Sequence, residues 1–520
     1  MNIAVALLGL IASTLATDPV VIKGQRMFKY STGAAFQVKG VDYYPRPNAG
    51  ILNINNYDFF TDANEAIWAP HIAQFAELGV NAIRLYSVDP SQSHDKFMCA
   101  LEAIGVYVLV DLAARYLPLC KKIVDWCSCE GCAVTLDPFP TCYPSTLKTR
   151  GQQIIVAFSK YNNVLGFSAG NEVNNVVADS KINAPCQKKF LRDMRAFINS
   201  CNKAMRPIPI GVVLSDFQRG PNALYYNCRT DPTDTLENTE WYGLNAYLQC
   251  DADASPTTAG PGYEKLLSDF TSYKMSVPVM LTEFGCLNVG FPTVDGYQAQ
   301  RTWLDAGWLL SDTFSSVFAG GLAFEFSTEN ANSAADSPYP FTKFGTQNYG
   351  LGYFSPATCD ARETPCVYNR MPNYGFLATK YNASNEAASM PSSASYVGYN
   401  AVPPACPAGF AALSSVTWAA DAVTDMLCPD LTATPLCPGD TIIAGNGKVI
   451  APLSPGGNTV APGGNVSPGT NGGAGTVGPV TPATTKSAGG AAQTANEGSD
   501  ASFLSVALPL AIMVAATLLG

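Results

Sequence analysis

The chain has 520 residues, a formal net charge of −10 and two histidines, His71 and His94. The negative charge argues against nucleic acid or an acidic polymer as a partner, whereas a neutral polymer is compatible with it. Two histidines give little support to a Ser-His-Asp triad or to a histidine-rich metal site. We therefore expect neither a bound metal nor a cofactor.

The N-terminal residues 1–16 are apolar and end in small residues. We interpret them as a secretory signal peptide, although the segment contains no Lys or Arg. A membrane anchor is the alternative, but the run is short for a membrane span. The chain also contains 16 cysteines. In a secreted protein this number indicates disulfides.

From about residue 36 onward, short apolar runs alternate with segments of helical spacing. The expected strands are 36–43, 82–86, 106–112, 164–172, 208–214, 241–247, 278–283 and 320–327. The expected helices are 71–78, 97–104, 151–161, 188–203 and 298–310, the first two closed by Gly79 and Gly105. Eight such steps fit a (β/α)8 barrel, which typically takes about 250 residues plus insertions. A doubly wound open sheet is the alternative, but no glycine-rich loop follows the first strand.

Two of the expected strands end in a glutamate, Glu172 after the fourth strand and Glu283 at the seventh. In a barrel, catalytic groups lie at the C-terminal ends of the strands. A lone glutamate there is ordinarily a solvated carboxylate. Two at one rim are what a glycosidase needs, one as proton donor and one as nucleophile. The pair therefore favours catalysis over a purely structural role.

A known family carries the same motifs in the same order. In this chain they read Gly40-Val41-Asp42-Tyr43, Asn81-Ala82-Ile83-Arg84-Leu85-Tyr86-Ser87-Val88-Asp89, His94-Asp95, Tyr107-Val108-Leu109-Val110-Asp111-Leu112, Ala169-Gly170-Asn171-Glu172-Val173 and Thr282-Glu283-Phe284-Gly285-Cys286. Over roughly residues 30–355 the chain resembles the fungal cell-wall β-1,3-glucanosyltransferases of glycoside hydrolase family 72. The resemblance implies a retaining reaction through a covalent glycosyl-enzyme and β-1,3-glucan, or a related neutral polysaccharide, as substrate.

The resemblance also assigns roles to individual residues. Glu172 matches the general acid/base and Glu283 the nucleophile, and we expect their carboxyl groups about 5–5.5 Å apart, the retaining spacing. The supporting residues that it implies are Asn171 on the sugar 2-hydroxyl, Arg84 and Tyr247 on the nucleophile, and Tyr43, Tyr86 and Asp111 as substrate contacts. The alternative for Arg84 is a surface salt bridge. The alternative for Tyr86, Asp111 and Tyr247 is a core or rim side chain.

The chain departs from the family pattern at several positions. Tyr44 stands where the family has Gln, Phe326 stands where it has Tyr, and Cys99 lacks its usual partner. The insertion 115–150 contains Cys120, Cys127, Cys129, Cys132 and Cys142, for which we expect disulfides, with zinc at Cys129-x-x-Cys132 as the alternative. By resemblance, Cys228 pairs with Cys250, and we expect Cys286 to pair downstream with Cys359.

The C-terminal part divides by composition. We expect a small cysteine-rich appendage at 356–437, with a glycosylation site at Asn382 on a surface loop, and a flexible Gly/Pro/Ser/Thr-rich stalk at 438–502. The apolar tail 503–520 fits a signal for a glycosylphosphatidylinositol (GPI) anchor, attached at Asn496, Gly498 or Ser499. A transmembrane helix is the alternative.

These observations predict a catalytic domain at 17–355, displayed as a monomer on the outer face of the plasma membrane and in the cell wall through a lipid anchor. The predicted activity is that of a retaining β-1,3-glucanosyltransferase. One alternative is a secreted hydrolase of the same mechanism, a β-glucanase or mannanase, in which water rather than a sugar attacks the glycosyl-enzyme. The other is a non-catalytic GPI-anchored wall protein that binds glucan.

Overall fold

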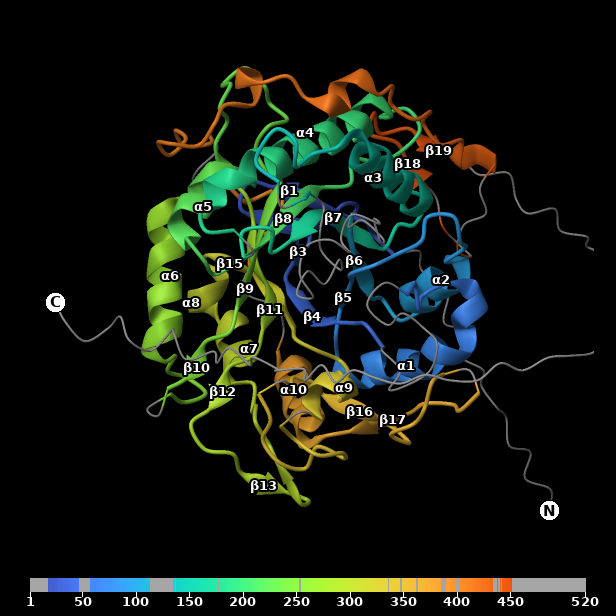
Figure 1. Cartoon of the computed structure of the whole chain (residues 1–520), viewed down its shortest axis with the longest axis vertical. Coiled ribbons are helices and arrows are strands. Elements are labelled where there is room, and N and C mark those ends of the chain that lie inside the picture. Colours follow the sequence, from blue (N-terminus) through green and yellow to red (C-terminus); the bar gives the residue numbers. More distant parts are fainter. Residues whose placement is uncertain are drawn as a thin grey trace, which may run out of the picture. The chain divides into compact units, whose positions relative to one another are not determined.

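The computed structural model describes residues 17–45, 57–112 and 134–450, apart from residues 136, 176, 252–253, 335, 347, 362, 385–389, 399–401, 434–436, 438–439 and 441. Its centre is a closed barrel of parallel strands (Figure 1). The barrel strands are β4 (Val38–Asp42), β5 (Ala82–Leu85), β6 (Tyr107–Asp111), β7 (Val164–Asn171), β8 (Ile210–Ser215), β9 (Trp241–Ala246), β11 (Val279–Phe284) and β15 (Phe318–Ala323). All eight expected barrel strands are confirmed.

Helices connect consecutive barrel strands and surround them (Figure 1). In chain order they are α1 (Glu65–Leu78), α2 (Asp95–Ala103), α3 (Ser145–Phe158), α4 (Ala184–Ser200), α5 (Arg219–Asn227), α6 (Pro261–Tyr273), α7 (Leu304–Leu309) and α8 (Asp312–Ser315), followed by α9 (Asn330–Ser333) and α10 (Pro372–Ala383). Helix α1 ends where predicted, because Gly79 adopts a left-handed φ of 76° and its N–H bonds back into the last turn.

The strand period of two explains why charged residues lie inside the barrel. On β5 and β6, Ile83, Leu85, Val108 and Val110 belong to the cluster that packs against the helices. Ala82, Tyr107 and Leu109 belong to a separate cluster in the lower barrel interior. The same alternation turns Arg84 and Asp111 inward, one layer above these apolar residues. The C-terminal half of the barrel interior is therefore polar.

An antiparallel sheet that the sequence pattern did not predict precedes the barrel. It consists of β1 (Val20–Lys23), β2 (Arg26–Lys29) and β3 (Ala35–Phe36). Val20, Met27 and Phe36 pack against interior residues near the N-terminal ends of the barrel strands. The sheet thus covers the end of the barrel opposite to the polar layer.

The prediction of a helix at 298–310 is wrong for the first half of this range. Gln298 lies in β14 (Tyr297–Gln298), which pairs with β13 (Thr293–Val294), and only 304–309 are helical. Arg301 is buried and donates from Nε to the Gly285 carbonyl, 3.1 Å away. This long-range contact holds the segment in an irregular path, which the helical spacing of its apolar residues does not reveal.

The boundary expected at residue 355 is also corrected, because the described residues beyond it belong to the same compact unit as the barrel. Helix α10 packs against α1 and α7, and β16 (Gly352–Ser355) pairs with β17 (Val367–Arg370) across the expected boundary. Further on, Lys148 Nζ of α3 donates to the Val423 carbonyl at 2.8 Å. The C-terminal segment therefore forms part of the outer layer of the barrel and is not a separate appendage.

The first residues of the expected stalk belong to the barrel domain. Residues 442–450 form a hairpin of β18 (Ile442–Ile443) and β19 (Val449–Ile450), with Gly447 at a left-handed φ of 78° in the turn. The backbone N–H of Gly445 bonds to the Met205 carbonyl at 2.9 Å, which joins the hairpin to the barrel domain. Asn382, expected on a loop, is exposed in the last turn of α10.

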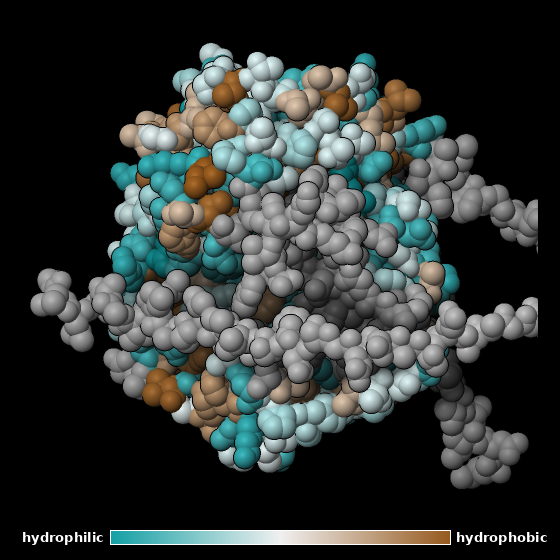
Figure 2. Space-filling view, viewed as in Figure 1, coloured by the Kyte–Doolittle hydropathy of each residue, from teal (hydrophilic) through white to brown (hydrophobic). Residues whose placement is uncertain are grey.

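Several expectations fall outside the described residues: the signal peptide, the chain beyond residue 450 with the anchor candidates Asn496, Gly498 and Ser499, and four cysteines of the insertion, Cys120, Cys127, Cys129 and Cys132. Within the described ranges, no helix is both long and apolar enough to cross a membrane. On the described surface visible in Figure 2, hydrophobic side chains form small separate groups among hydrophilic ones.

Among the described residues, six disulfides confirm the expectation of an oxidised chain. They are Cys99–Cys437, Cys142–Cys186, Cys201–Cys428, Cys228–Cys406, Cys250–Cys286 and Cys359–Cys366. The expected pairing of Cys228 with Cys250 is wrong, as is that of Cys286 with Cys359. Strand β10 (Gln249–Cys250) pairs with β12 (Leu287–Asn288), and this brings Cys250 beside Cys286.

Three of these bridges tie the C-terminal segment to the barrel. We expect removal of the bridge between Cys201 and Cys428, 227 residues apart, to reduce the free energy of unfolding by about 3–5 kcal/mol, because it closes a long loop. Replacement of both cysteines by serine, followed by urea unfolding, measures this. The Cys359–Cys366 bridge spans only 7 residues, and its removal is the matched control with a smaller expected loss. Equal losses would contradict the loop-closure explanation.

Candidate active site

The polar layer at the C-terminal end of the barrel is built around Arg84, which is fully buried on β5. Its Nε and Nη2 donate to the two carboxylate oxygens of Asp111 at 3.1 and 2.8 Å. Its Nη1 lies 3.2 Å from Glu283 Oε1. A guanidinium that holds two carboxylates fixes their positions in an interior where unpaired charges would be strongly destabilising. The alternative of a surface salt bridge for Arg84 is therefore wrong.

Glu283, on β11, is 5% exposed and accepts hydrogen bonds at both oxygens. In addition to Arg84, Tyr86 OH donates to Oε1 at 2.9 Å. Tyr247 OH donates to Oε2 at 2.5 Å, and the Tyr247 side chain remains 44% exposed at the rim. Three donors, one of them a cation, stabilise the ionised carboxylate. This environment suits a carboxylate that must be negatively charged when it reacts.

Glu172 directly follows β7 and lies in a different environment. Its backbone is in the left-handed region, with φ of 48°, while its N–H bonds to the Val213 carbonyl at 3.0 Å. A non-glycine residue in this region is strained by about 1–3 kcal/mol. Among the described residues, two amides donate hydrogen bonds to its carboxyl group: Asn245 Nδ2 at 2.9 Å and Asn175 Nδ2 at 3.3 Å.

The surroundings of Glu172 raise its affinity for a proton. Burial, followed by the negative charge of Glu283, raises the pKa of Glu172 to about 7. A neutral amide donor does little to oppose this, whereas Glu283 has the guanidinium of Arg84. A carboxyl group with a raised pKa beside a second carboxyl group that faces a cation and two hydroxyl donors is the arrangement required for acid-assisted displacement at a glycosidic carbon.

Two amide side chains connect the glutamates. Asn171 Oδ1 accepts from Arg84 Nη2 at 2.9 Å and from Asn245 Nδ2 at 3.1 Å. Asn245 Oδ1 in turn accepts from Thr282 Oγ1 at 2.8 Å. Because the carbonyl oxygen of Asn171 is held by two donors, its NH2 group is the part left to meet a ligand. The site is thus one connected network from β5, β7, β9 and β11.

Most of the predicted site residues are brought together, but two of them, Tyr43 and Asp111, are not placed to contact a substrate. Tyr43 is fully buried outside the barrel wall, where its hydroxyl bonds to His71 Nδ1 at 2.7 Å. It cannot contact a substrate there, so that prediction is wrong. Asp111 is also fully buried and both of its oxygens bind Arg84, so it orients the arginine and does not contact a sugar directly.

The two substitutions relative to the family pattern have structural explanations. The Tyr44 hydroxyl donates to the Tyr57 carbonyl at 2.9 Å. Phe326 is fully buried and stacks on Tyr368 with ring centroids 4.3 Å apart. Both positions therefore contribute to packing behind the rim.

The sequence analysis did not single out Asn245, although it lies in the expected strand 241–247, where its polar side chain between apolar residues was the available signal. It also missed the aromatic group of Tyr247, Phe324 and Tyr349 beside Glu283, in which Tyr247 lies 5.9 Å from Phe324 and 5.7 Å from Tyr349 between ring centroids. No local pattern marks Tyr349, because it lies in an irregular segment after the barrel.

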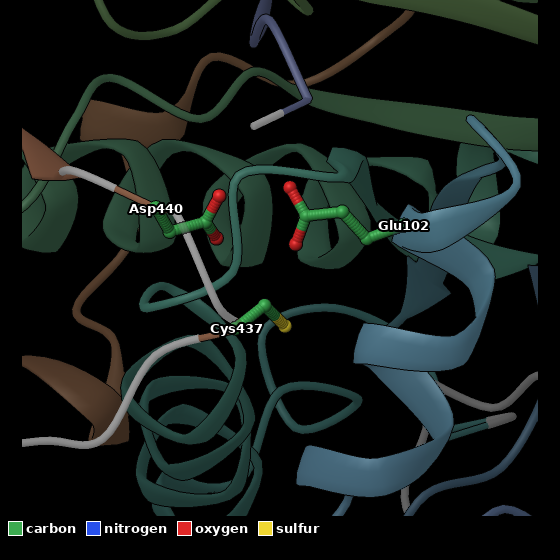
Figure 3. A group of neighbouring side chains, drawn as sticks. All are labelled: Glu102, Cys437 and Asp440. Carbon is green, nitrogen blue, oxygen red and sulfur yellow. The ribbon is translucent and has the colours of Figure 1, made fainter. Parts of the chain in front are cut away.

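In the described part of the chain, one group of side chains has the composition of a metal site: Glu102, Cys437 and Asp440, with ligand atoms within 4.8 Å of one another (Figure 3). Cys437 is bonded to Cys99 and so offers no thiolate. Burial and the negative charge of Glu102 raise the pKa of Asp440 to about 8. Two facing carboxyl groups that share a proton account for this arrangement. The group lies apart from the glutamate pair, on α2 and the C-terminal segment.

Comparison with known proteins agrees with this geometry. Residues 10–335 match the model of a family described as glucanosyltransferase, glycoside hydrolase family 72. The chain belongs to this family. It is 32% identical over 330 residues to the 1,3-beta-glucanosyltransferase PGA4 of Candida albicans, covering 63% of this chain and 64% of that protein. It is 30% identical over 398 residues to GAS5 of Saccharomyces cerevisiae, covering 74% of this chain and 72% of that protein.

The chain spans 56 to 64% of the length of the first three curated relatives that it matches. Among solved structures, it is similar to an apo form of a mutant of Saccharomyces cerevisiae Gas2, with a TM-score of 0.57 and 25% identity over 76% of this chain and 71% of that one. A Gas2 complex with laminaritetraose and laminaripentaose has the same fold, with a TM-score of 0.55 at 24% identity over 76% and 73% of the chains.

Proposed function

We propose that this protein is a retaining β-1,3-glucanosyltransferase that cleaves a β-1,3-glucan chain and joins the new end to a second chain. The observation that carries the proposal is the contrast between the two glutamates: Glu283 with one cationic and two phenolic donors, and Glu172 with amide donors and a pKa raised to about 7. In a retaining reaction, the first is suited to be the nucleophile and the second the acid/base.

In the first half-reaction, the Glu283 carboxylate attacks the anomeric carbon of the donor. Glu172 gives its proton to the departing glycosidic oxygen, and the reducing-end fragment leaves. In the second half-reaction, Glu172, now a carboxylate, takes the proton of an acceptor sugar hydroxyl. That oxygen attacks the same carbon and releases Glu283, so that one glycosidic bond breaks and one forms.

The remaining network residues have positioning roles in this scheme. Arg84, Tyr86 and Tyr247 hold the nucleophile ionised and correctly oriented. The NH2 group of Asn171 is suited to bind the sugar 2-hydroxyl, a contact that strengthens in the transition state. The carboxyl separation of about 5–5.5 Å stays a prediction of the retaining mechanism.

The names of the relatives support the choice of glucan. PGA4 and GAS5 are described as 1,3-beta-glucanosyltransferases, and the solved Gas2 complex contains laminari-oligosaccharides. We infer that the substrate here is likewise a β-1,3-linked glucan. The net charge of −10 is compatible with such a neutral polymer.

The proposal includes a location on the outer face of the plasma membrane and in the cell wall. Disulfides persist in oxidising compartments, and six occur in the described residues. We propose a monomer held by a GPI anchor, since the sequence has small residues before the apolar tail 503–520. Release from intact membranes by phosphatidylinositol-specific phospholipase C tests the anchor. Retention of the 503–520 peptide in the mature protein would contradict it.

Incubation of the purified protein with reduced laminari-oligosaccharides tests the activity. Reduction blocks the end of each oligosaccharide, so every product longer than the starting material reports transfer. We expect longer products. Products that are only shorter would replace the proposal by a hydrolase, and an absence of products together with retained glucan binding would favour a non-catalytic wall protein. A Glu283→Gln variant is the control for contaminating activity.

A further inference from the structure

Asp42 is a buried carboxyl group next to the site that the scheme above does not use. It is the last residue of β4, it is 1% exposed, and by the strand alternation it points into the barrel, with Val41 on the helix side. Neither of its oxygens has a hydrogen-bond partner among the described residues. An ionised carboxylate in this position would be strongly disfavoured, since buried charges require pairing and donors.

Arg84 is the nearest cation, but its protons are already used. A guanidinium has five N–H groups. Three of them are directed to the two oxygens of Asp111 and to Asn171 Oδ1, at 2.8–3.1 Å. Those of Nη1 face Glu283 Oε1 at 3.2 Å and, at 3.5 Å, the Thr282 carbonyl and the Tyr86 hydroxyl oxygen. Asp42 Oδ1 is 4.0 Å from Nη1, beyond hydrogen-bonding distance.

Tyr86 is the hydroxyl group next to Asp42, and its single proton is also used. The hydroxyl donates to Glu283 Oε1 at 2.9 Å, which leaves only its oxygen to interact with Asp42. Interaction with this oxygen requires a donor on Asp42, and a carboxyl group is a donor only when it is protonated.

The hydrogen-bond geometry of the layer thus leaves Asp42 one way to interact with the Tyr86 oxygen, as a donor. We propose that Asp42 is a neutral carboxylic acid that donates to the Tyr86 hydroxyl, which in turn donates to Glu283, so that Asp42 positions the nucleophile through Tyr86. The inference rests on the proposed function in taking Glu283 as the nucleophile.

The charges around Asp42 agree with this assignment. The groups that face it are Arg84 from β5, Tyr86 directly after β5, Asp111 from β6, Glu283 from β11, Tyr247 after β9 and Tyr381 from α10. The Tyr381 proton goes to the Gly40 carbonyl at 2.8 Å. Burial holds the pKa of Asp42 well above its usual range; Arg84 and the contact with Tyr86 oppose this, whereas Glu283 and Asp111 act in the same direction as burial. A neutral Asp42 leaves one guanidinium facing two carboxylates instead of three.

The chain of donors has a consequence for catalysis. A hydroxyl that accepts a hydrogen bond becomes a stronger donor, because consecutive hydrogen bonds polarise one another. Donation by Asp42 therefore strengthens the contact of Tyr86 with Glu283 Oε1 without placing a further negative charge near the nucleophile. Asn at position 42 would preserve both features, since its NH2 group donates and it is uncharged.

Paired substitutions test the proposal. We expect Asp42→Asn to lower kcat/KM by less than about tenfold and Asp42→Leu, which has no donor, by about 10- to 100-fold, the range for partners that orient a reacting group. Asp111→Asn is the matched control: it removes a true carboxylate partner of Arg84 and should be much more damaging than Asp42→Asn. In a Tyr86→Phe background the difference between the two Asp42 variants should disappear.

An infrared difference spectrum between the wild type and Asp42→Asn reports the proton directly. We expect a carbonyl band of a neutral carboxylic acid to be lost at a pH above 7, where Glu172 is ionised. Loss of a carboxylate band instead, or equal kinetic damage from Asp42→Asn and Asp42→Leu, would overturn the proposal. The infrared result needs no turnover, so Asp42 is judged independently even if the transfer reaction itself fails.

Discussion

Replacing Glu172 by Gln is expected to slow cleavage of unactivated laminari-oligosaccharides by a factor of about 100 to 10,000, the usual contribution of general acid–base catalysis. Glutamine preserves the contact with Asn245, which donates to Oε1 at 2.9 Å, but it has no proton to give to the leaving oxygen. The loss should therefore appear in kcat more than in KM.

A sugar donor whose leaving group needs no proton separates the role of the general acid from that of the nucleophile. With a laminari-oligosaccharide fluoride, Glu172→Gln should form the glycosyl-enzyme at a rate much closer to that of the wild type. Glu283→Gln should fail with both donors, since it has no nucleophile. The exposed Glu264 on α6 offers a control, Glu264→Gln, for which we expect no change. Equal defects of Glu172→Gln on both donors would contradict the acid assignment.

The pH dependence follows from the same residue. Since the pKa of Glu172 is about 7, the acid is protonated below that pH, and the rate should fall as the pH rises through about 7. The same shift affects the free energy of unfolding. Between pH 4.5 and 7 Glu172 keeps its proton in the native state, whereas in the unfolded chain it loses it. The free energy of unfolding therefore decreases as the pH rises through this window. Glu172→Gln should therefore stabilise the fold by about 3 kcal/mol above pH 7 and not below pH 4.5.

Replacing Arg84 by Met is expected to lower the free energy of unfolding by about 3–5 kcal/mol and to abolish activity. The guanidinium is fully buried between Asp111 and Glu283, at 2.8 and 3.2 Å. Its removal would leave two carboxylates buried without their cation, which would have to take up protons or be exposed to water. A protonated Glu283 is no longer a nucleophile, so stability and activity should fail together.

Urea unfolding of the variant measures this prediction. Arg370→Ala is the matched control, since Arg370 forms an ion pair with Glu77 at the surface, with side chains 40% and 56% exposed. Such pairs contribute about 0–1 kcal/mol. Arg84→Lys should lie between the wild type and Arg84→Met, because lysine restores the charge without the two-pronged contact to Asp111. A loss for Arg84→Met as small as that for Arg370→Ala would show that the site tolerates the unpaired carboxylates.

The local pattern of apolar residues was sufficient to predict the barrel strands and to place the two glutamates at their ends. Each barrel strand is a short apolar run, and burial on both sides makes such runs easy to recognise in a parallel sheet. Glu172 and Glu283 could be paired in advance because the ends of parallel strands meet at one rim, whatever the helices between them do. Arg84 could be included through the resemblance to the family, because the strand pattern by itself left a surface salt bridge open.

Tertiary structure decided which neighbours along the chain share a face. Asp42 and Tyr43 are adjacent, and strand alternation requires one to point inward and the other outward, but the sequence does not say which. The fold directs Tyr43 to His71 and the helix layer, and Asp42 to the nucleophile. The sequence does not indicate the proposed proton on Asp42, because that proposal depends on which acceptors the N–H groups of Arg84 and the hydroxyl of Tyr86 already bind.

The pairing of the cysteines likewise could not be predicted from the sequence. Cys228 joins Cys406, 178 residues away, and Cys99 joins Cys437, 338 residues away. The chain between such cysteines can bring many alternative pairs together, so spacing has no power to choose among them. Thus the sequence by itself determined the barrel, its strand ends and the pair of reactive carboxyl groups, because these depend on short periodic patterns. The tertiary structure decided the cysteine partners, the packing of the C-terminal segment and the protonation of the layer, because each depends on contacts between distant residues.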